Sequence, residues 1–202
     1  MRAHPHYNPF NVRNPSECPD WSKVFARSEQ PLDLEIGFST GRWLISYAQN
    51  FPERNIAGLE IRAKFIEYVQ QKIIAGKLTN AYVLKANANT ALAELFAPQS
   101  LSRVIIMFPD PWYKARHIKR RVVDQDFLRE LAVRLKSGAE LHIATDQQAL
   151  AEDMYADLLA VPEYQNKYTR YAPENFAGIV TDIERYNQER GREIYRLVFI
   201  RN

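Results

Sequence analysis

Cysteine and histidine are scarce in this sequence of 202 residues, which contains one cysteine and four histidines. The single Cys18 excludes an intramolecular disulfide and a cysteine-rich zinc site. The histidines are scattered and lack the paired spacing of metal ligands: His4, His6, His117 and His142. We therefore expect no metal centre.

Long apolar runs are also absent. No stretch approaches the roughly 20 consecutive apolar residues that a membrane-spanning helix requires. The opening stretch, MRAHPHYNPFNVRNP, is polar and rich in proline, and it has no apolar segment of the kind that a secretory signal contains. These features predict a soluble cytoplasmic protein without a membrane partner.

Neither sign of charge dominates the chain, yet the positive charges are unevenly distributed. The formal net charge is only +3. One cluster of bases consists of Lys114, Arg116, Lys119, Arg120 and Arg121, and a second of Arg185, Arg190, Arg192, Arg196 and Arg201. Two cationic clusters on a nearly neutral chain indicate a polyanionic partner that binds to one face.

Apolar segments and helical segments alternate along most of the chain. Five segments are rich in β-branched and other apolar residues, as buried strands are: 32–38, 55–61, 81–87, 103–109 and 139–145. Five others carry helical patterns: 41–50, 62–75, 90–96, 126–136 and 147–159. The alternation predicts an α/β fold with a mostly parallel sheet and helices on both of its faces.

The end of the chain departs from this alternation. Residues 193–202 alternate apolar and polar side chains, which predicts an antiparallel strand at the edge of the sheet, with residues 166–172 as its partner. Residues 1–31 resemble an arm that wraps over the sheet. We therefore expect residues 32–202 to form a single domain.

Glycines and carboxylates gather where the first strands are predicted to end. Glu35 precedes Gly37, and Gly41 opens the next helix, so the backbone there can approach a ligand or simply make a tight turn. Glu60 ends the second strand about 20 residues farther on, where a carboxylate can bind two ribose hydroxyls. Asn87, which ends the third strand, can hydrogen-bond a heterocycle or cap the following helix.

This arrangement does not suit a phosphate group. The sequence has no G-x-x-x-x-G-K-[ST] loop, and Glu35 beside the glycines would repel a pyrophosphate. A positively charged ligand with a ribose fits better. S-adenosylmethionine, a sulfonium that also carries an ammonium group, is such a ligand.

The stretch FPDPWYKARHIKRR, residues 108–121, places one acid before a dense run of bases. Pro109 and Pro111 fix two φ angles and so hold Asp110 at the end of the fourth predicted strand. Trp112 can stack on a purine or pack beneath the loop. Five side chains that follow are expected to bind a nucleic-acid backbone: Arg116, His117, Lys119, Arg120 and Arg121.

The same stretch resembles the signature of the tRNA (guanine-N7)-methyltransferases. Five further segments occur in the order and approximate spacing of that family: LEIGFSTGRWL, GLEIRAKF, KANA, HIATD and TDIE. The resemblance implies a Rossmann-like class I methyltransferase fold. It also implies transfer of a methyl group from S-adenosyl-L-methionine to N7 of a guanine in the variable loop of tRNA.

The resemblance assigns roles to individual residues. The cofactor positions of the family are matched by Glu35, Glu60, Asn87 and Asp110, with Gly37 in the same glycine loop. Asp110 also matches the residue considered catalytic. The substrate positions are matched by Lys114, Asp146, Thr181, Asp182, Ile183 and Glu184.

The chemistry of guanine N7 agrees with these roles. N7 has an exposed in-plane lone pair and no proton to lose, so the reaction needs alignment with the methyl group rather than a strong base. A purine methylated at N7 is cationic. Asp110 and Asp146 can stabilise that developing charge or orient the base.

Two other functions are compatible with parts of the sequence. Ser39 stands where the family commonly has glycine and Asn87 where it has aspartate, which would suit a non-catalytic tRNA-binding relative with an impaired cofactor pocket. Methyltransferases that act on exocyclic amines also place an acid or amide beside prolines, but they lack the basic run after Trp112. Because Glu35, Glu60, Asp110 and Asp146 are all intact, the sequence favours the enzyme.

Overall fold

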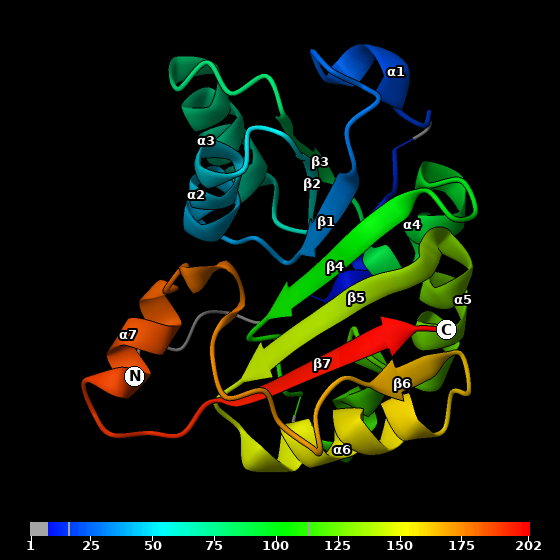
Figure 1. Cartoon of the computed structure of the whole chain (residues 1–202), viewed down its shortest axis with the longest axis vertical. Coiled ribbons are helices and arrows are strands. Elements are labelled where there is room, and N and C mark those ends of the chain that lie inside the picture. The colour runs from blue at the N-terminus through cyan, green and yellow to red at the C-terminus, as the bar shows by residue number, and fades with distance from the viewer. Residues whose placement is uncertain (1–7, 16, 113) are drawn as a thin grey trace.

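A seven-stranded sheet runs through the middle of the protein (Figure 1). The computed structural model describes residues 8–15, 17–112 and 114–202. The strands are β1 (Leu32–Ile36), β2 (Asn55–Glu60), β3 (Ala81–Lys85), β4 (Leu101–Met107), β5 (Leu135–Thr145), β6 (Tyr164–Asn166) and β7 (Tyr195–Arg201). Their order is β3-β2-β1-β4-β5-β7-β6. Strands β1 to β5 are parallel, and β7 is antiparallel to both of its neighbours.

Helices cover both faces of the sheet, as predicted. The α-helices are α1 (Trp21–Val24), α2 (Arg42–Asn50), α3 (Ala63–Ala75), α4 (Ala88–Leu95), α5 (Gln125–Arg134), α6 (Gln148–Leu159) and α7 (Asp182–Gln188). Short 3-10 helices are η1 (Pro9–Asn11), η2 (Ala115–Arg120) and η3 (Phe176–Gly178). Helices α2 and α3 pack on one face, and α4, α5 and α6 on the other. The predicted α/β fold with a mostly parallel sheet is therefore confirmed.

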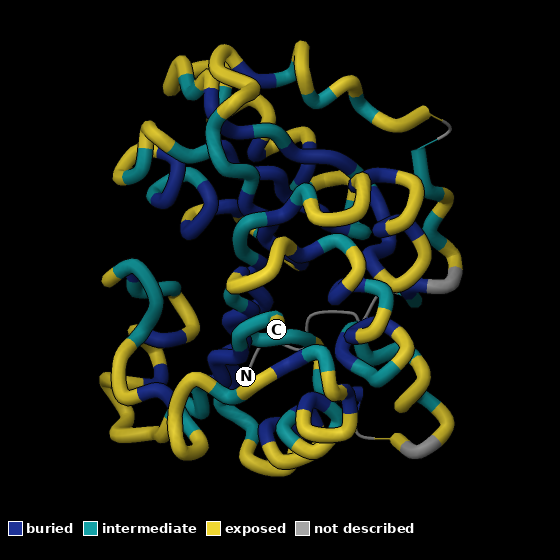
Figure 2. The backbone as a smooth tube through the Cα atoms, turned by 45° about the vertical axis from the view of Figure 1, so that its right-hand side comes forward, coloured by how far each residue is buried: buried dark blue, intermediate teal, exposed yellow. Residues whose placement is uncertain are grey.

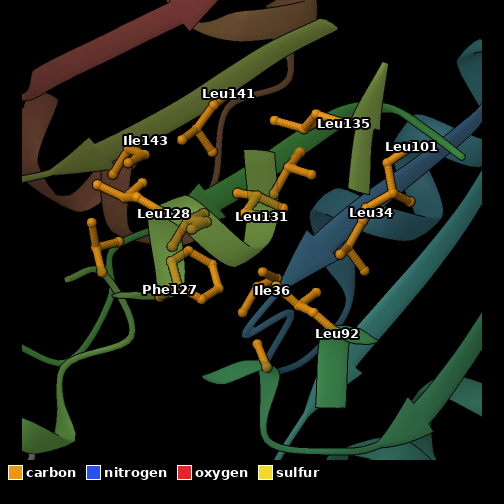
Figure 3. Packing of buried hydrophobic residues seen from close by; sticks show 14 of the residues in the cluster. Leu34, Ile36, Leu92, Leu101, Phe127, Leu128, Leu131, Leu135, Leu141 and Ile143 are labelled. Carbon is orange, nitrogen blue, oxygen red and sulfur yellow. The ribbon is translucent and has the colours of Figure 1, made fainter. Parts of the chain in front are cut away.

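The larger half of the core lies between the sheet and α4, α5 and α6. Phe127, Leu128 and Leu131 recur at helical spacing along α5 and lie in one cluster with Ile36 of β1 and with Leu141 and Ile143 of β5 (Figure 3). Burying each such side chain contributes roughly 1.5–3 kcal/mol to stability. Figure 2 colours the described residues by burial, and most of the buried ones lie in the interior while most of the exposed ones lie at the periphery.

On the other face, α2 approaches β2 closely because residue 58 is glycine. A Cβ atom on Gly58 would lie 2.5 Å from Cδ1 of Leu44 and 2.7 Å from Cδ1 of Phe38. Neither neighbour can move far, since both are buried. The strand and the helix therefore have no room for a side chain at this position.

We expect Gly58→Ala to lower the free energy of unfolding by about 1–3 kcal/mol, because the added methyl group overpacks this contact. Urea unfolding monitored by circular dichroism measures the change. Gly76→Ala, which adds the same methyl group at the exposed end of α3, serves as the control and should stay within about 0.5 kcal/mol of wild type. Equal effects of the two substitutions would contradict the packing argument.

The last strand pair differs from its prediction. Residues 166–172 were expected to pair with the C-terminal strand, and the antiparallel pairing is confirmed, but β6 is Tyr164–Asn166 and so starts two residues earlier. Tyr164 is buried and donates from its hydroxyl to the carbonyl of Leu128 at 2.9 Å, which fixes the strand before the expected segment begins. Beyond Asn166, the N–H groups of Lys167 and Ala172 still donate to carbonyls of β7, at 2.9 and 2.8 Å.

The described part of the N-terminal arm follows α4 from one end to the other. At the start of α4, the Asn14 amide donates to Oγ1 of Thr90 at 2.9 Å. At its end, Trp21 donates from Nε1 to the carbonyl of Leu95 at 2.6 Å and stacks on Phe96 with ring centroids 5.2 Å apart. The arm thus contacts α4 at both ends of that helix.

Candidate active site

The carboxyl ends of β1 to β4 border a cavity at the point where the strand order reverses. Chain connections leave β1 toward β2 on one side, while β4 lies on the other, and a ligand binds at such a point in open α/β sheets. The cavity holds about 780 Å³ of empty space, open solvent included. Its lining includes the predicted cofactor residues Gly37, Glu60, Asn87 and Asp110.

The loop after β1 turns sharply before α2. Gly37 and Gly41 have φ angles of +81° and +67°, which favour glycine, and a Cβ on Gly41 would lie 2.5 Å from Cγ2 of Val69. Ser39 also has a left-handed φ, at +49°. Its N–H donates to Oε2 of Glu60 at 3.1 Å, so this strained residue helps to hold the carboxylate in place.

Glu60 is held by its own neighbours as well. Its Oε1 accepts from the N–H of Ile61 at 2.8 Å, and Arg62 donates to both carboxylate oxygens, from Nε at 3.1 Å and from Nη2 at 2.9 Å. The guanidinium of Arg62 lies 4.4 Å from the ring centroid of Phe65. Arg62 therefore neutralises Glu60, and a ribose that bound to this carboxylate would compete with it.

Glu35 does not line the cavity but precedes Ile36, which does. Glu35 is 3% exposed, and its Oε2 has no hydrogen-bond partner within the described part of the chain. Burial, and to a lesser extent the charge of Glu60, raises the pKa of Glu35 to about 8. An unpartnered buried carboxyl group beside a cavity suits a cationic group on a ligand.

Glu35→Gln is expected to stabilise the protein at alkaline pH. The ordinary pKa of Glu35 is 4.5, so the folded protein binds more protons than the unfolded chain between that value and about 8, and wild-type stability falls as the pH rises through this window. An amide at this position cannot titrate. The free energy of unfolding of the variant, relative to that of wild type, should therefore rise by about 1.4 kcal/mol per pH unit within this window. Urea unfolding at both ends of the window measures this. A difference independent of pH would contradict the raised pKa.

Asn87 combines two contacts with a place in the cavity wall. Its Oδ1 accepts from the N–H of Asn89 at 3.2 Å, so the helix-capping interpretation is correct. Its Nδ2 donates to the carbonyl of Pro9 at 3.2 Å, and its own N–H donates to Oδ1 of Asn14 at 3.0 Å. Pro9 lines the cavity too. An aspartate at position 87 could not make the contact to Pro9, because a carboxylate has no hydrogen to donate.

The loop that carries Asp110 is strained. Phe108 and Trp112 have φ angles of +53° and +42°, and each such non-glycine residue costs roughly 1–3 kcal/mol. Asp110 itself is exposed and lines the cavity. Trp112 is only 7% exposed and lies between the guanidinium of Arg120, 5.1 Å from its ring, and the edge of His117. Trp112 therefore packs beneath the loop, and it also lines the cavity, so stacking on a purine stays a prediction.

The basic run divides into two groups. Lys114, Arg116 and Lys119 are exposed, as phosphate-binding side chains should be. Arg120 lines the cavity and stacks on the indole, and Arg121 donates to the backbone of the loop. From the sequence, Arg116, Lys119, Arg120 and Arg121 were all expected to bind the tRNA backbone. In the structure, Arg120 and Arg121 contact the loop instead.

Asp146 follows β5, the strand beside β4, and is fixed by two amides. Its Oδ1 accepts from Nε2 of Gln147 at 3.0 Å, and its Oδ2 accepts from Nδ2 of Asn187 at 3.2 Å. Asn187 lies on α7 and is fully buried. The structure therefore brings the T-D-I-E segment, which begins α7, close to the end of β5.

The four T-D-I-E residues have different environments. Thr181 and Glu184 form a capping box, with Oγ1 of Thr181 accepting from the N–H of Glu184 at 3.0 Å, and Glu184 also binds Nη2 of Arg196 at 2.9 Å. Asp182 forms an exposed ion pair with Arg42 at the start of α2. Ile183 is 45% exposed. Asp182 and Ile183 are thus available to a substrate, while Glu184 is buried and paired.

Sequence reasoning missed the helix α7 and three of these partners. The T-x-x-E spacing is itself a helix-start signal, and it could have revealed α7. Arg62 follows Glu60 by two positions and could have been recognised as its partner. By contrast, Asn187 and Arg42 are distant in sequence from Asp146 and Asp182, so no local pattern identifies those contacts.

The described residues contain no group of three His, Cys, Asp or Glu side chains that could hold a metal ion. No helix in the described part of the chain is long and apolar enough to cross a membrane.

Comparisons with known proteins agree with this architecture. Residues 29–197 match the family model described as "Putative methyltransferase". The chain is 39% identical, over 97% of its length and 84% of the relative, to "tRNA (guanine-N(7)-)-methyltransferase" of Synechococcus sp. (strain JA-3-3Ab). It is 40% identical to the protein of that name from Burkholderia vietnamiensis, over 94% of this chain and 74% of the relative. Its fold is similar to that of the 16S rRNA methyltransferase KamB, with a TM-score of 0.68 at 18% identity over 92% of this chain and 95% of that one.

Proposed function

Since this chain belongs to the family of the tRNA (guanine-N(7)-)-methyltransferases, we propose that it transfers a methyl group from S-adenosylmethionine to N7 of a guanine in the variable loop of tRNA. The observation that carries the proposal is the meeting of Glu60, Asn87 and Asp110 around one cavity, with Glu35 buried behind it. The family resemblance suggests the reaction, and this grouping supplies side chains that suit it.

The residues around the cavity fit the proposed cofactor. Oε2 of Glu35 is a buried acceptor without a partner in the described chain, and a cationic group placed near it would satisfy the carboxylate and stabilise its ionised form. Glu60 can accept ribose hydroxyls once Arg62 gives way. When bound, S-adenosylmethionine supplies an electrophilic methyl group on a sulfonium, so the protein itself needs no nucleophile.

Asp110 is the proposed catalytic residue. It lines the cavity at the end of β4 and is exposed, so a purine can approach it from solvent. Guanine has N–H donors on its Watson–Crick edge, and a carboxylate can orient the base by accepting from them. The same negative charge stabilises the positive charge that develops on the purine as N7 is methylated. Asp146, on the adjacent strand end, can share this role.

The exposed bases are proposed to hold the tRNA. Lys114, Arg116 and Lys119 are exposed and follow the loop that carries Asp110, and phosphate contacts of the proposed kind position a nucleic acid without reading its sequence. The proposed substrate contacts of Asp182 and Ile183 lie on α7, which Asn187 connects to Asp146. A tRNA substrate accords with the expected cytoplasmic location.

A direct assay tests the proposal. Purified protein is incubated with S-adenosylmethionine carrying a labelled methyl group and with bulk tRNA, and the tRNA is then digested to nucleosides. We expect the label in 7-methylguanosine, and ribosomal RNA serves as the control substrate. Label in an N-methylated exocyclic amine would favour the other class of methyltransferase. A chain that does not bind the cofactor even at millimolar concentration would instead be a non-catalytic tRNA-binding relative.

A further inference from the structure

Arg121 contacts the loop of Asp110 rather than solvent. Its Nε donates to the carbonyl of Pro111, the residue after Asp110, at 2.9 Å. Its Nη1 donates to Oδ2 of Asp153 on α6 at 2.7 Å, and the Arg121 side chain is only 17% exposed. One guanidinium thus joins the loop to a helix, and little of its charge remains available to a phosphate.

The loop needs such an attachment because its backbone is strained on both sides of Asp110. Phe108 and Trp112 both have left-handed φ angles although neither is glycine. Strained conformations of this kind persist only where surrounding contacts enforce them. At the first position, the N–H of Phe108 donates to the carbonyl of Ala144 at 2.7 Å. At the second, Trp112 is buried beneath Arg120. The contact from Arg121 to Pro111 lies between these two points.

We propose that Arg121 is a positioning residue that holds the strained loop, and with it Asp110, in the orientation required for methyl transfer. This inference rests on the proposed function for the role of Asp110. The proposal gives Arg121 a different role from Arg116 and Lys119, which belong to the same basic run but are exposed to solvent.

The second contact of Arg121, with Asp153, attaches the loop to a particular helix. Asp153 lies on α6, the helix that begins immediately after the Asp146 loop. Arg121 therefore connects the loop at the end of β4, which carries Asp110, with the helix that follows Asp146. The forked guanidinium can bind a carbonyl and a carboxylate together, and the single ammonium of a lysine cannot reproduce that geometry.

Three variants test the proposal. Arg121→Ala and Arg121→Lys should each lower kcat at saturating tRNA at least tenfold. The salt dependence of tRNA binding should stay as in wild type, because few phosphate contacts are lost. Hydrogen exchange in peptides covering residues 105–112 should become faster. Asp153→Asn, at a largely exposed position that folding tolerates, should produce a smaller change in the same direction.

Arg116→Ala, which removes the same charge from the same run, should reduce the salt slope of tRNA binding by about 1. Arg129→Ala is the matched control for activity, since it removes an exposed guanidinium on α5 outside the proposed site, and it should leave kcat at saturating tRNA and exchange of the loop unchanged. Two results would overturn the proposal. One is wild-type kcat and exchange in Arg121→Ala, and the other is full rescue by Arg121→Lys, which would mean that charge alone matters.

Failure of the proposed function would give a different result. If wild-type protein transferred no methyl group to tRNA, the role of Asp110 would be lost for every variant. The exchange of residues 105–112 would still report whether Arg121 fixes the loop. A structural attachment without a catalytic effect would then appear as faster exchange in Arg121→Ala with no activity to compare.

Discussion

Asp110→Asn is expected to reduce methyl transfer to tRNA by roughly 10²–10³-fold, because it removes the negative charge that is proposed to lie beside the reacting purine. The substitution keeps the size of the side chain and the two flanking prolines, so the loop should keep its shape. tRNA affinity should change little, since the exposed bases, and not Asp110, are proposed to bind the backbone. Single-turnover transfer of labelled methyl groups and filter binding of tRNA measure the two quantities separately.

The control for this variant is Asp126→Asn. Asp126 is an exposed carboxylate in the first turn of α5, where it forms an ion pair with the neighbouring Arg129, and it does not line the cavity. The substitution removes the same unit of charge away from the site, so transfer should match wild type. If the two variants had equal turnover, Asp110 would have no catalytic role.

Asp33→Ala should have the largest effect on stability, about 3–5 kcal/mol, because it removes a fully buried carboxylate that is paired with two partly buried guanidinium groups. Asp33 is completely buried at the opposite end of β1 from Gly37. It accepts from the hydroxyl of Tyr47 at 2.6 Å and from Nε and Nη2 of Arg54, each at 2.6 Å. A second guanidinium, that of Arg103, lies 3.7 Å away. Urea unfolding gives the change in free energy.

Asp126→Ala provides the comparison for this prediction too. It breaks an exposed ion pair with Arg129, and such pairs contribute about 0–1 kcal/mol. The two aspartates therefore separate the effect of burial from the effect of charge. A loss below about 1 kcal/mol for Asp33→Ala would show that Arg54 and Arg103 find water or other acceptors once the carboxylate is gone.

The sheet was predictable because its strands carry local signals. Each parallel strand is a short apolar run bounded by polar or turn-forming residues, and Glu60 and Asp110 follow such runs directly. Since parallel strands place their carboxyl ends at one edge, the meeting of these side chains could be inferred without coordinates. The start of β5 at Leu135 was missed, because the helical pattern of α5 continues into that residue and its pairing with Leu101 is a long-range contact.

The division of the basic run was not predictable in the same way. Arg116 and Arg121 are the same residue type in one short motif, and nothing in the sequence separates them. Their difference depends on the carbonyl of Pro111 and on Asp153, and Asp153 lies 32 residues beyond Arg121. Long-range partners of this kind decide whether a cation serves a ligand or the protein itself, and composition carries no information about them.

The bond between Asn87 and Pro9 has a consequence for the wall of the cavity. An aspartate at position 87 could not donate to the carbonyl of Pro9, whereas the bond from the backbone N–H of residue 87 to Asn14 would remain. Asn87→Asp should therefore release Pro9, which lines the cavity, and leave the rest of the arm attached.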